Sequence, residues 1–180
     1  MNLIQSPRQD VAMSSFDATE NRINRTCERA PGFPREAAML VRLVKALAGG
    51  VHGAANVALR EYGLNHTDYN VLMMLYGSDN GVITPSELRD AAAEKSANIT
   101  RVCNSLCERG WIQRVPDRHD RRKVMLSLTA AGEALIGRFL PTMGQLLERY
   151  TQDFSGDDMA SLERLLKRLL ANVDSVEQSP

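Results

Sequence analysis

The residues with the clearest chemical purpose lie in segment 95–125, where positive charge is concentrated. This segment has eight basic and three acidic residues and therefore a net charge of +5, whereas the 180-residue chain has 22 basic and 22 acidic residues. The rest of the chain is then acidic by the same amount. A basic segment on an otherwise acidic chain is typical of a surface that binds a polyanion such as a nucleic acid.

A helix in this segment would present one face suited to reading the edges of base pairs. Four residues at helical spacing would face a core: Ile99, Val102, Cys103 and Leu106. The opposite face has small residues near the start of the helix, then amides and a guanidinium, which can pair bidentately with adenine and guanine. The residues predicted to contact DNA from this helix are Ser96, Ala97, Asn98, Thr100, Arg101, Asn104 and Ser105.

Two strands and a basic loop are predicted after this helix. Gly110 would end the helix, since glycine readily takes the left-handed conformation found there. Residues 111–115 and 124–128 are β-type runs, and the second alternates, with Val124, Leu126 and Leu128 on one side. The loop between them, PDRHDRRK, contains further residues predicted to contact DNA: Arg118, Arg121 and Arg122. Helix, strand, basic loop and strand together predict a winged helix-turn-helix with a two-stranded β wing.

These residues resemble the MarR (multiple antibiotic resistance regulator) family of bacterial winged-helix repressors. The matching features are S-E-L at residue 86, a T-R pair, a helix that ends in E-R-G, an Asp-Arg-Arg wing and L-T-x-x-G. The resemblance implies a homodimer whose first and last helices interlock. It also implies that Asp120 forms an ion pair with Arg122 in the wing. A wing-tip arginine would enter the minor groove, and a narrow A·T-rich groove attracts such a residue.

The resemblance also implies a cleft for a small ligand between the long first helix, the second helix and the DNA-binding lobe. In wing and helix spacing the chain looks most like members that repress efflux genes or that respond to small aromatic acids or urate. Asn70 stands where the urate-responsive branch has an aspartate, which argues against urate itself. The candidate ligand-binding residues are Arg42, His66, Tyr69, Asn70, Met73 and Met74. An ordinary core role for the methionines is the alternative.

The chain divides into four predicted parts, which make the fold mainly α. Residues 1–34 are an N-terminal extension with a weak helix, and residues 35–63 are a long helix at the junction between the dimer and the DNA-binding lobe. Gly49, Gly50 and Gly53 in that helix predict close packing or a cavity wall. Residues 64–128 are the winged helix-turn-helix lobe, and residues 129–180 are C-terminal dimerisation helices. In the last part Pro141 predicts a kink or a restart, and an apolar stripe from Leu162 onward predicts a partner.

Helix starts are marked by capping residues. Asn65 with Asp68, and Thr84 with Glu87, fit capping boxes, while Thr129 and Ser155 precede the last two helices.

Catalysis, metal binding and cofactor binding are not expected. No pair of the three histidines is spaced at i, i+4, and the sequence has no G-x-S-x-G, P-loop or dinucleotide motif. Three cysteines without regular spacing favour a reducing cytoplasm. No run of about 18 apolar residues predicts a membrane span, and no secretory signal is visible.

We therefore predict a cytoplasmic homodimer that represses transcription from a pseudo-palindromic operator of double-stranded DNA and is released by a small aromatic acid. Two alternatives stay open. Cys103 and Cys107 lie one helical turn apart, with Arg101 and Arg109 nearby to favour a thiolate, which would fit a redox-sensing repressor. A winged-helix interaction module, whose basic wing binds an acidic protein and not DNA, is the other.

Overall fold

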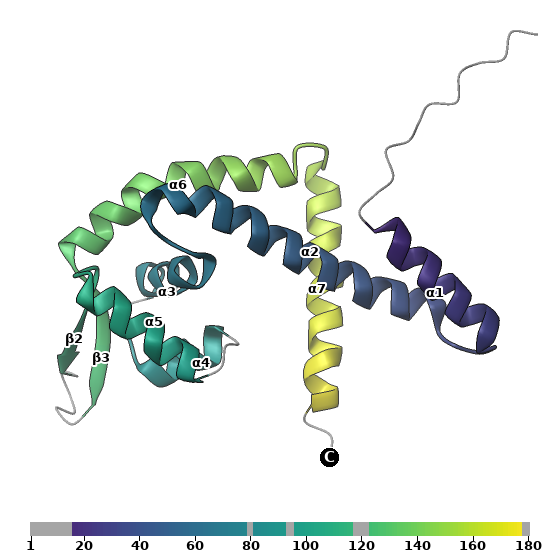
Figure 1. The fold of residues 1–180 in the computed structure, drawn as a ribbon, viewed down its shortest axis with the longest axis horizontal. Coiled ribbons are helices and arrows are strands. Elements are labelled where there is room, and N and C mark those ends of the chain that lie inside the picture. The colour runs from purple at the N-terminus through teal and green to yellow at the C-terminus, as the bar shows by residue number, and fades with distance from the viewer. Residues whose placement is uncertain (1–15, 79–80, 93–95, 117–122, 178–180) are drawn as a thin grey trace, which may run out of the picture. The chain divides into compact units, whose positions relative to one another are not determined.

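The computed structural model describes residues 16–78, 81–92, 96–116 and 123–177, and most of them are helical (Figure 1). In chain order the elements are α1 (Asp17–Arg29), α2 (Arg35–Leu59), the 3-10 helix η1 (Arg60–Tyr62), α3 (His66–Tyr76), β1 (Val82–Ile83), α4 (Pro85–Ala92), α5 (Ser96–Glu108), β2 (Ile112–Pro116), β3 (Val124–Leu128), α6 (Ala130–Tyr150) and α7 (Gly156–Glu177). Contacts divide the chain into two compact units, residues 1–57 and 58–180. The predicted mainly helical winged-helix class is confirmed.

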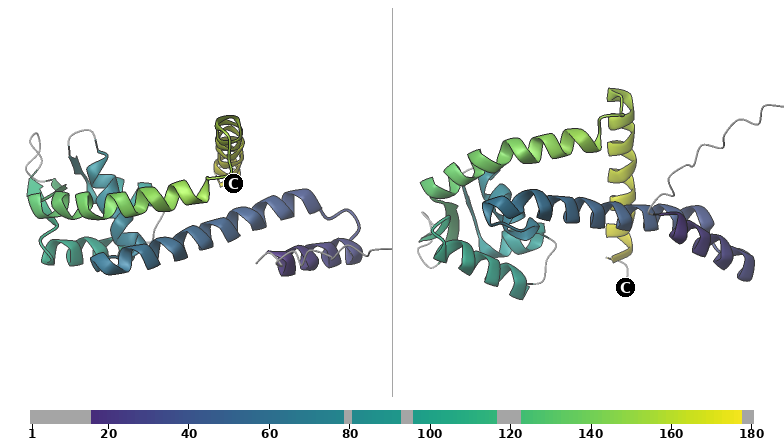
Figure 2. Two further views of the ribbon diagram at one scale, coloured as in Figure 1. Left: turned by 90° about the horizontal axis from the view of Figure 1, so that it is seen from above. Right: turned by 45° about the horizontal axis from the view of Figure 1, so that its top comes forward.

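In the first unit, α1 folds back beside the start of α2 as a helical hairpin (Figures 1 and 2). Gly32 in the connecting turn has a φ of 91°, a left-handed conformation that glycine adopts without strain. Arg35 of α2 donates from Nε to Asn24 Oδ1 at 2.8 Å, and its Nη2 lies 3.3 Å from Glu20 Oε1. Ile23 is the buried residue of α1. The weak N-terminal helix predicted from the sequence is therefore present, with few contacts to hold it.

The second unit contains the winged-helix lobe, whose core is assembled from many elements. Helix α3 packs against α4, α5, α6 and β3. Five side chains at the centre of this core are no more than 1% exposed: Leu72, Leu88, Leu106, Leu126 and Phe139. Full burial of a side chain of this size contributes about 1.5 to 3 kcal/mol. The lobe thus has an apolar core made within one chain.

The three strands form an antiparallel sheet with β3 in the centre, in the order β1, β3, β2. Leu126 of β3 lies opposite Ile83 of β1 on one side and Arg114 of β2 on the other. The predicted two-stranded wing missed β1, because a strand of two residues is too short to show alternation. Of the residues predicted to share one side of β3, Leu126 is 1% exposed, whereas Val124, beside Pro116 at the end of the strand pair, is 47% exposed.

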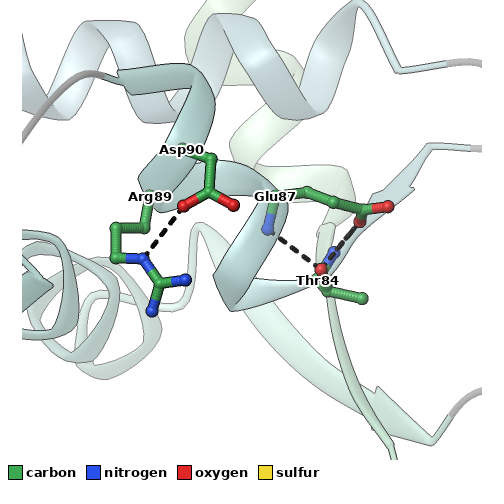
Figure 3. A network of polar contacts seen from close by, with 4 residues as sticks. All are labelled: Thr84, Glu87, Arg89 and Asp90. Atoms are coloured by element: carbon green, nitrogen blue, oxygen red, sulfur yellow. Dashed lines mark hydrogen bonds and ion pairs between the residues drawn. The ribbon is translucent and has the colours of Figure 1, made fainter. Parts of the chain in front are cut away.

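Two helices of the lobe begin with the capping boxes predicted from the sequence. At α3, Asn65 Oδ1 accepts from the Asp68 N–H at 3.0 Å, and Asp68 Oδ2 accepts from the Asn65 N–H at 3.1 Å. At α4, Thr84 Oγ1 accepts from the Glu87 N–H at 3.1 Å, and Glu87 Oε2 accepts from the Thr84 N–H at 2.8 Å (Figure 3). Each N-cap stabilises its helix by about 1 kcal/mol. Short-range hydrogen bonds therefore fix where both helices start.

The L-T-x-x-G motif joins the start of α6 to the end of α5. Thr129 Oγ1 accepts from the Gly132 N–H at 3.1 Å and donates to the Gly110 carbonyl oxygen at 2.6 Å. A Cβ on Gly132 would lie 2.1 Å from the Trp111 carbonyl oxygen, so this close approach requires glycine. Beyond it, α6 runs through Pro141 as one helix (Figure 2), which excludes the predicted restart.

The long helices α2 and α7 keep apolar side chains exposed in the single chain. On α2, Leu47 and Val57 are 64% and 66% exposed, and on α7, Leu170 and Val176 are 60% and 73% exposed. A Cβ added to any of the three α2 glycines, at positions 49, 50 and 53, would meet no atom within 4 Å. No described residue therefore makes the close packing or cavity wall predicted for these glycines, and it stays a prediction.

Among the residues that the structure describes, one helical stretch is long and apolar enough to cross a membrane. Residues Arg35–Tyr62 reach a mean hydropathy of 1.2 over 18 residues. The sequence did not predict a membrane span here, because Arg42 and Lys45 interrupt the apolar run. A long helix with an uncovered apolar face also fits association with another protein surface.

Candidate nucleic-acid interface

Helix α5 has one buried face and one open face, as its sequence predicts. The four residues expected in the core, Ile99, Val102, Cys103 and Leu106, are between 0% and 4% exposed. The other face borders a shallow open groove lined by Ala97, Thr100, Arg101, Asn104, Ser105 and Glu108. Small side chains near the N-terminal end leave the helix backbone accessible there, while the polar groups are further along. This arrangement fits insertion of the start of the helix into a major groove.

The C-terminal end of α5 is fixed by contacts that the sequence analysis did not predict. Gly110 has a φ of 72°, the left-handed conformation expected at this helix end. The Arg109 guanidinium lies 3.5 Å from the centre of the Trp111 ring, and its Nη2 donates to the Gly63 carbonyl oxygen at 2.8 Å. Gly63 ends η1 in a left-handed conformation. One arginine thus links the end of α5 to the turn before α3.

Two arginines hold the amides of the open α5 face. Arg101 Nη2 donates to Asn98 Oδ1 at 3.0 Å, within α5. Arg114 Nη2, from β2, donates to Asn104 Oδ1 at 2.6 Å. Arg114 belongs to the basic segment 95–125 but was not among the residues predicted to contact DNA. The structure adds it to the site through this contact.

The structure describes the strands of the predicted wing but not the loop between them. Strands β2 and β3 form the predicted hairpin, and Lys123, directly before β3, is exposed. Arg118, Asp120, Arg121 and Arg122 lie outside the described residues, and so does the predicted ion pair of Asp120 with Arg122. For Ser96, the structure describes the backbone at the start of α5.

The environment of Cys103 argues against a reactive thiolate. Cys103 is 4% exposed, and burial raises the pKa of its thiol. Cys107 raises that pKa further, while Arg114 opposes the shift. A thiol that is protonated and buried reacts slowly with oxidants, because the thiolate is the reactive form. The structure therefore favours a core role for Cys103 over the redox-sensing alternative.

The predicted ligand-binding residues fall into two groups, one in each unit. His66, Tyr69, Asn70, Met73 and Met74 lie together on α3 and are partly exposed. The Tyr69 ring stacks on the His66 ring at 6.1 Å and meets Phe139 of α6 edge-on at 5.6 Å. Burial raises the pKa of the Tyr69 hydroxyl. These rings form an apolar aromatic cluster that is still reachable from solvent.

Arg42 belongs to the other group, in the α1–α2 hairpin. It lines an open groove between α1 and α2 together with Ile23, Phe33 and Val41. This groove combines apolar walls with the guanidinium groups of Arg22 and Arg42.

The MarR family profile matches residues 62–123 of the chain. The transcriptional repressor MprA of Escherichia coli K12 is 31% identical over 165 residues, which cover 92% of this chain and 94% of MprA. Among solved structures, a mutant MarR from E. coli complexed with operator DNA has a TM-score of 0.67 and 28% identity. That match covers 77% of this chain and 98% of the other. A MarR/EmrR family transcriptional regulator from Acinetobacter sp. ADP1 has a TM-score of 0.70 at 19% identity, covering 76% of this chain and 96% of the other, which shows a shared fold.

Proposed function

The chain belongs to the MarR family of transcriptional regulators, and from that premise we propose that it is a homodimeric, ligand-responsive repressor in the cytoplasm. On this proposal it binds a pseudo-palindromic operator and dissociates when a small aromatic acid binds. The observation that carries the proposal is the open face of α5, with small residues at its start and Arg101 and Asn104 further along, above a fully buried core face. The likeness to MprA, which is named a repressor, supports the sign of regulation.

The proposed DNA contacts come from α5 and the wing. Residues Ser96, Ala97, Asn98, Thr100, Arg101, Asn104 and Ser105 would face the major groove. The proposed wing contacts are Arg118, Arg121 and Arg122, with Asp120 bracing Arg122, and an arginine there would enter the minor groove. Support for direct base contact comes from Arg101, whose guanidinium is exposed on the groove-lining face of α5.

The homodimer is proposed because the described residues of one chain leave the apolar faces of α2 and α7 exposed. The alternative of a membrane helix fits α2 less well, because α2 carries Arg42 and Lys45 and the family is one of transcriptional regulators. A two-fold dimer would place two α5 helices in successive major grooves, about 34 Å apart.

The proposed effector is a planar aromatic acid. The cluster of Tyr69, His66 and Phe139 offers aromatic faces to the ring of such an acid. Arg42, proposed from the sequence alone, carries a guanidinium that can pair with a carboxylate. Asn70, Met73 and Met74 complete the proposed site on α3, where methionine can adapt to the shape of a ligand. A thousandfold loss of operator affinity needs about 4 kcal/mol of preferential binding to the released state.

The DNA-binding part is tested by selecting bound fragments from the source genome and measuring affinity for the selected site. Arg101→Ala should weaken operator binding by about 1 to 3 kcal/mol and relax base specificity. Arg138→Ala on α6 is the matched control, since Arg138 is exposed but lies outside the proposed interface. Equal loss in both variants, or no selected sequence at all, would contradict operator binding. Binding to heparin as tight as to duplex DNA would favour the interaction-module alternative.

The effector part is tested by adding benzoate or another planar aromatic acid to the operator complex, with cyclohexanecarboxylate as the non-planar match. The planar acid should dissociate the complex, and Tyr69→Ala or Arg42→Ala should weaken this response while leaving operator affinity nearly unchanged. Release by peroxide that Cys103→Ser abolishes, with no response to any aromatic acid, would instead establish the redox alternative.

A further inference from the structure

We propose that Arg114 is a positioning residue for base recognition, which holds the amide of Asn104 so that its N–H groups are offered to the DNA. The inference rests on the proposed function, because it takes the open face of α5 to be the base-reading surface. Its starting observation is the 2.6 Å hydrogen bond from Arg114 Nη2 to Asn104 Oδ1, which joins β2 to the open face of α5.

The chemistry of the two side chains determines which way the amide points. A guanidinium has donors only, whereas an asparagine amide has an acceptor at Oδ1 and two donors at Nδ2. Only Oδ1 can therefore meet Arg114. A flipped amide would set N–H against N–H and lose a charge-assisted hydrogen bond. Asn104 Nδ2 is thus the end of the amide left for a ligand in the groove that Asn104 lines.

Both residues are attached to well-supported backbone. Arg114 of β2 lies opposite Leu126 of the central strand β3, and Leu126 is 1% exposed. The Arg114 side chain lines a small cleft with Thr100 and Cys103 of α5. Asn104 follows directly after Cys103, which is buried in the core of the lobe. The pair therefore joins two fixed elements, and its geometry does not depend on a loop.

The orientation of the amide changes which base it can read. An unrestrained asparagine pairs with adenine through both Oδ1 and Nδ2. Arg114 occupies one of the two lone pairs of Oδ1, so the pair presents mostly donors: the Asn104 Nδ2 hydrogens and the remaining guanidinium hydrogens. Guanine offers two acceptors in the major groove, at N7 and O6, so it is the best match. Arg101 engages Asn98 Oδ1 with the same polarity, which makes this face of α5 rich in donors.

The experiment is selection from a random duplex library with the full-length protein, followed by sequencing of bound and unbound DNA. Four chains are compared: wild type, Arg114→Ala, Asn104→Ala and the double variant. Arg89→Ala is the matched control, because Arg89 lines the same cleft as Arg114 but is paired with Asp90 at 3.1 Å (Figure 3). The readout is the base preference at each operator position. A purely structural or phosphate-binding role of Arg114 would not change the preference at one position alone.

Wild type should prefer guanine at one position of each half-site, and Arg114→Ala should reduce that preference about tenfold or shift it to adenine. Asn104→Ala should lose the preference at the same position, and the double variant should match Asn104→Ala. Arg89→Ala should keep the wild-type preference at every position. An Arg114→Ala chain that binds all sequences more weakly but retains every base preference would overturn the inference and leave operator binding intact. A wild-type chain that selects no sequence would overturn the proposed function and this inference with it.

Discussion

The winged-helix lobe and the long helices α2 and α7 differ in how far one chain covers their apolar side chains. In the lobe, Leu72, Leu106 and Phe139 are fully buried. On α7, Leu162 is 42% exposed and Val176 is 73% exposed. The lobe is therefore stabilised by contacts within the chain, whereas the described residues of one chain leave the apolar faces of α2 and α7 exposed, which fits their burial against another surface. Stability of the lobe and assembly of the protein should respond to different mutations.

The largest expected effect is a charge placed on the apolar face of α7. Leu166 is 44% exposed, and Leu166→Asp would put a carboxylate into the surface proposed to meet the second chain. Burying an unpaired carboxylate costs several kcal/mol, so association should weaken by at least about a hundredfold and operator binding should fall with it. Sedimentation and DNA binding measure the two effects.

Ala171→Asp provides the control on the same helix. Ala171 is exposed and lies on the polar side of the helical pattern that places Leu166 on the apolar side. This variant adds the same charge but should leave assembly nearly unchanged. Equal dissociation by both variants would mean that charge on α7, and not its apolar face, controls assembly.

A smaller effect is expected from a mutation that destabilises the winged-helix lobe and leaves the assembly surface unchanged. Gly132→Ala would bring a Cβ to 2.1 Å from the Trp111 carbonyl oxygen, so α6 or the end of α5 must move. Overpacking of this kind costs about 1 to 3 kcal/mol in the free energy of unfolding. Gly137→Ala is the control, because its added Cβ meets no atom within 4 Å and alanine favours helix by up to about 1 kcal/mol.

Urea unfolding at fixed protein concentration distinguishes the two glycine variants. The expected result is a loss of stability for Gly132→Ala and no change or a gain for Gly137→Ala. Two variants with the same unfolding midpoint would show that the junction of α5 with α6 tolerates the added methyl group.

The smallest effect is a pH dependence local to the start of α4. Hydrogen bonds from the Thr84 backbone and hydroxyl lower the pKa of Glu87. A carboxylate with a lowered pKa in the folded state adds stability at neutral pH, and this is lost as the pH falls through that pKa. When the pH is lowered from 7 to below the ordinary pKa of glutamate, the free energy of unfolding should therefore fall less for Glu87→Gln than for wild type. Identical acid dependence in both chains would contradict the role of this cap.

Features that depend on neighbouring residues were predicted from the sequence. The hydrogen bonds confirm the caps at Asn65, Thr84, Thr129 and Ser155. These caps could be predicted because each joins groups only three residues apart. The buried face of α5 was also predicted, because helical spacing alone assigns it.

Contacts between distant parts of the chain were not predicted. Arg109 and Gly63 are 46 residues apart, and Arg114 and Asn104 belong to different elements. The spacing of residues in a basic segment does not predict which group an exposed arginine will contact. The short strand β1 was missed for a related reason. Its two residues form a strand only because they pair with β3, which is distant in the sequence.

The proposal that the chain binds its operator as a homodimer is tested most directly by sedimentation. The labelled full-length chain is measured at nanomolar concentration, with and without the selected operator duplex. We expect a dimer without DNA and two chains on each duplex, because the apolar faces of α2 and α7 then remain covered and two α5 helices reach successive grooves. A compact single chain in solution, and one chain on each duplex, would contradict the claim.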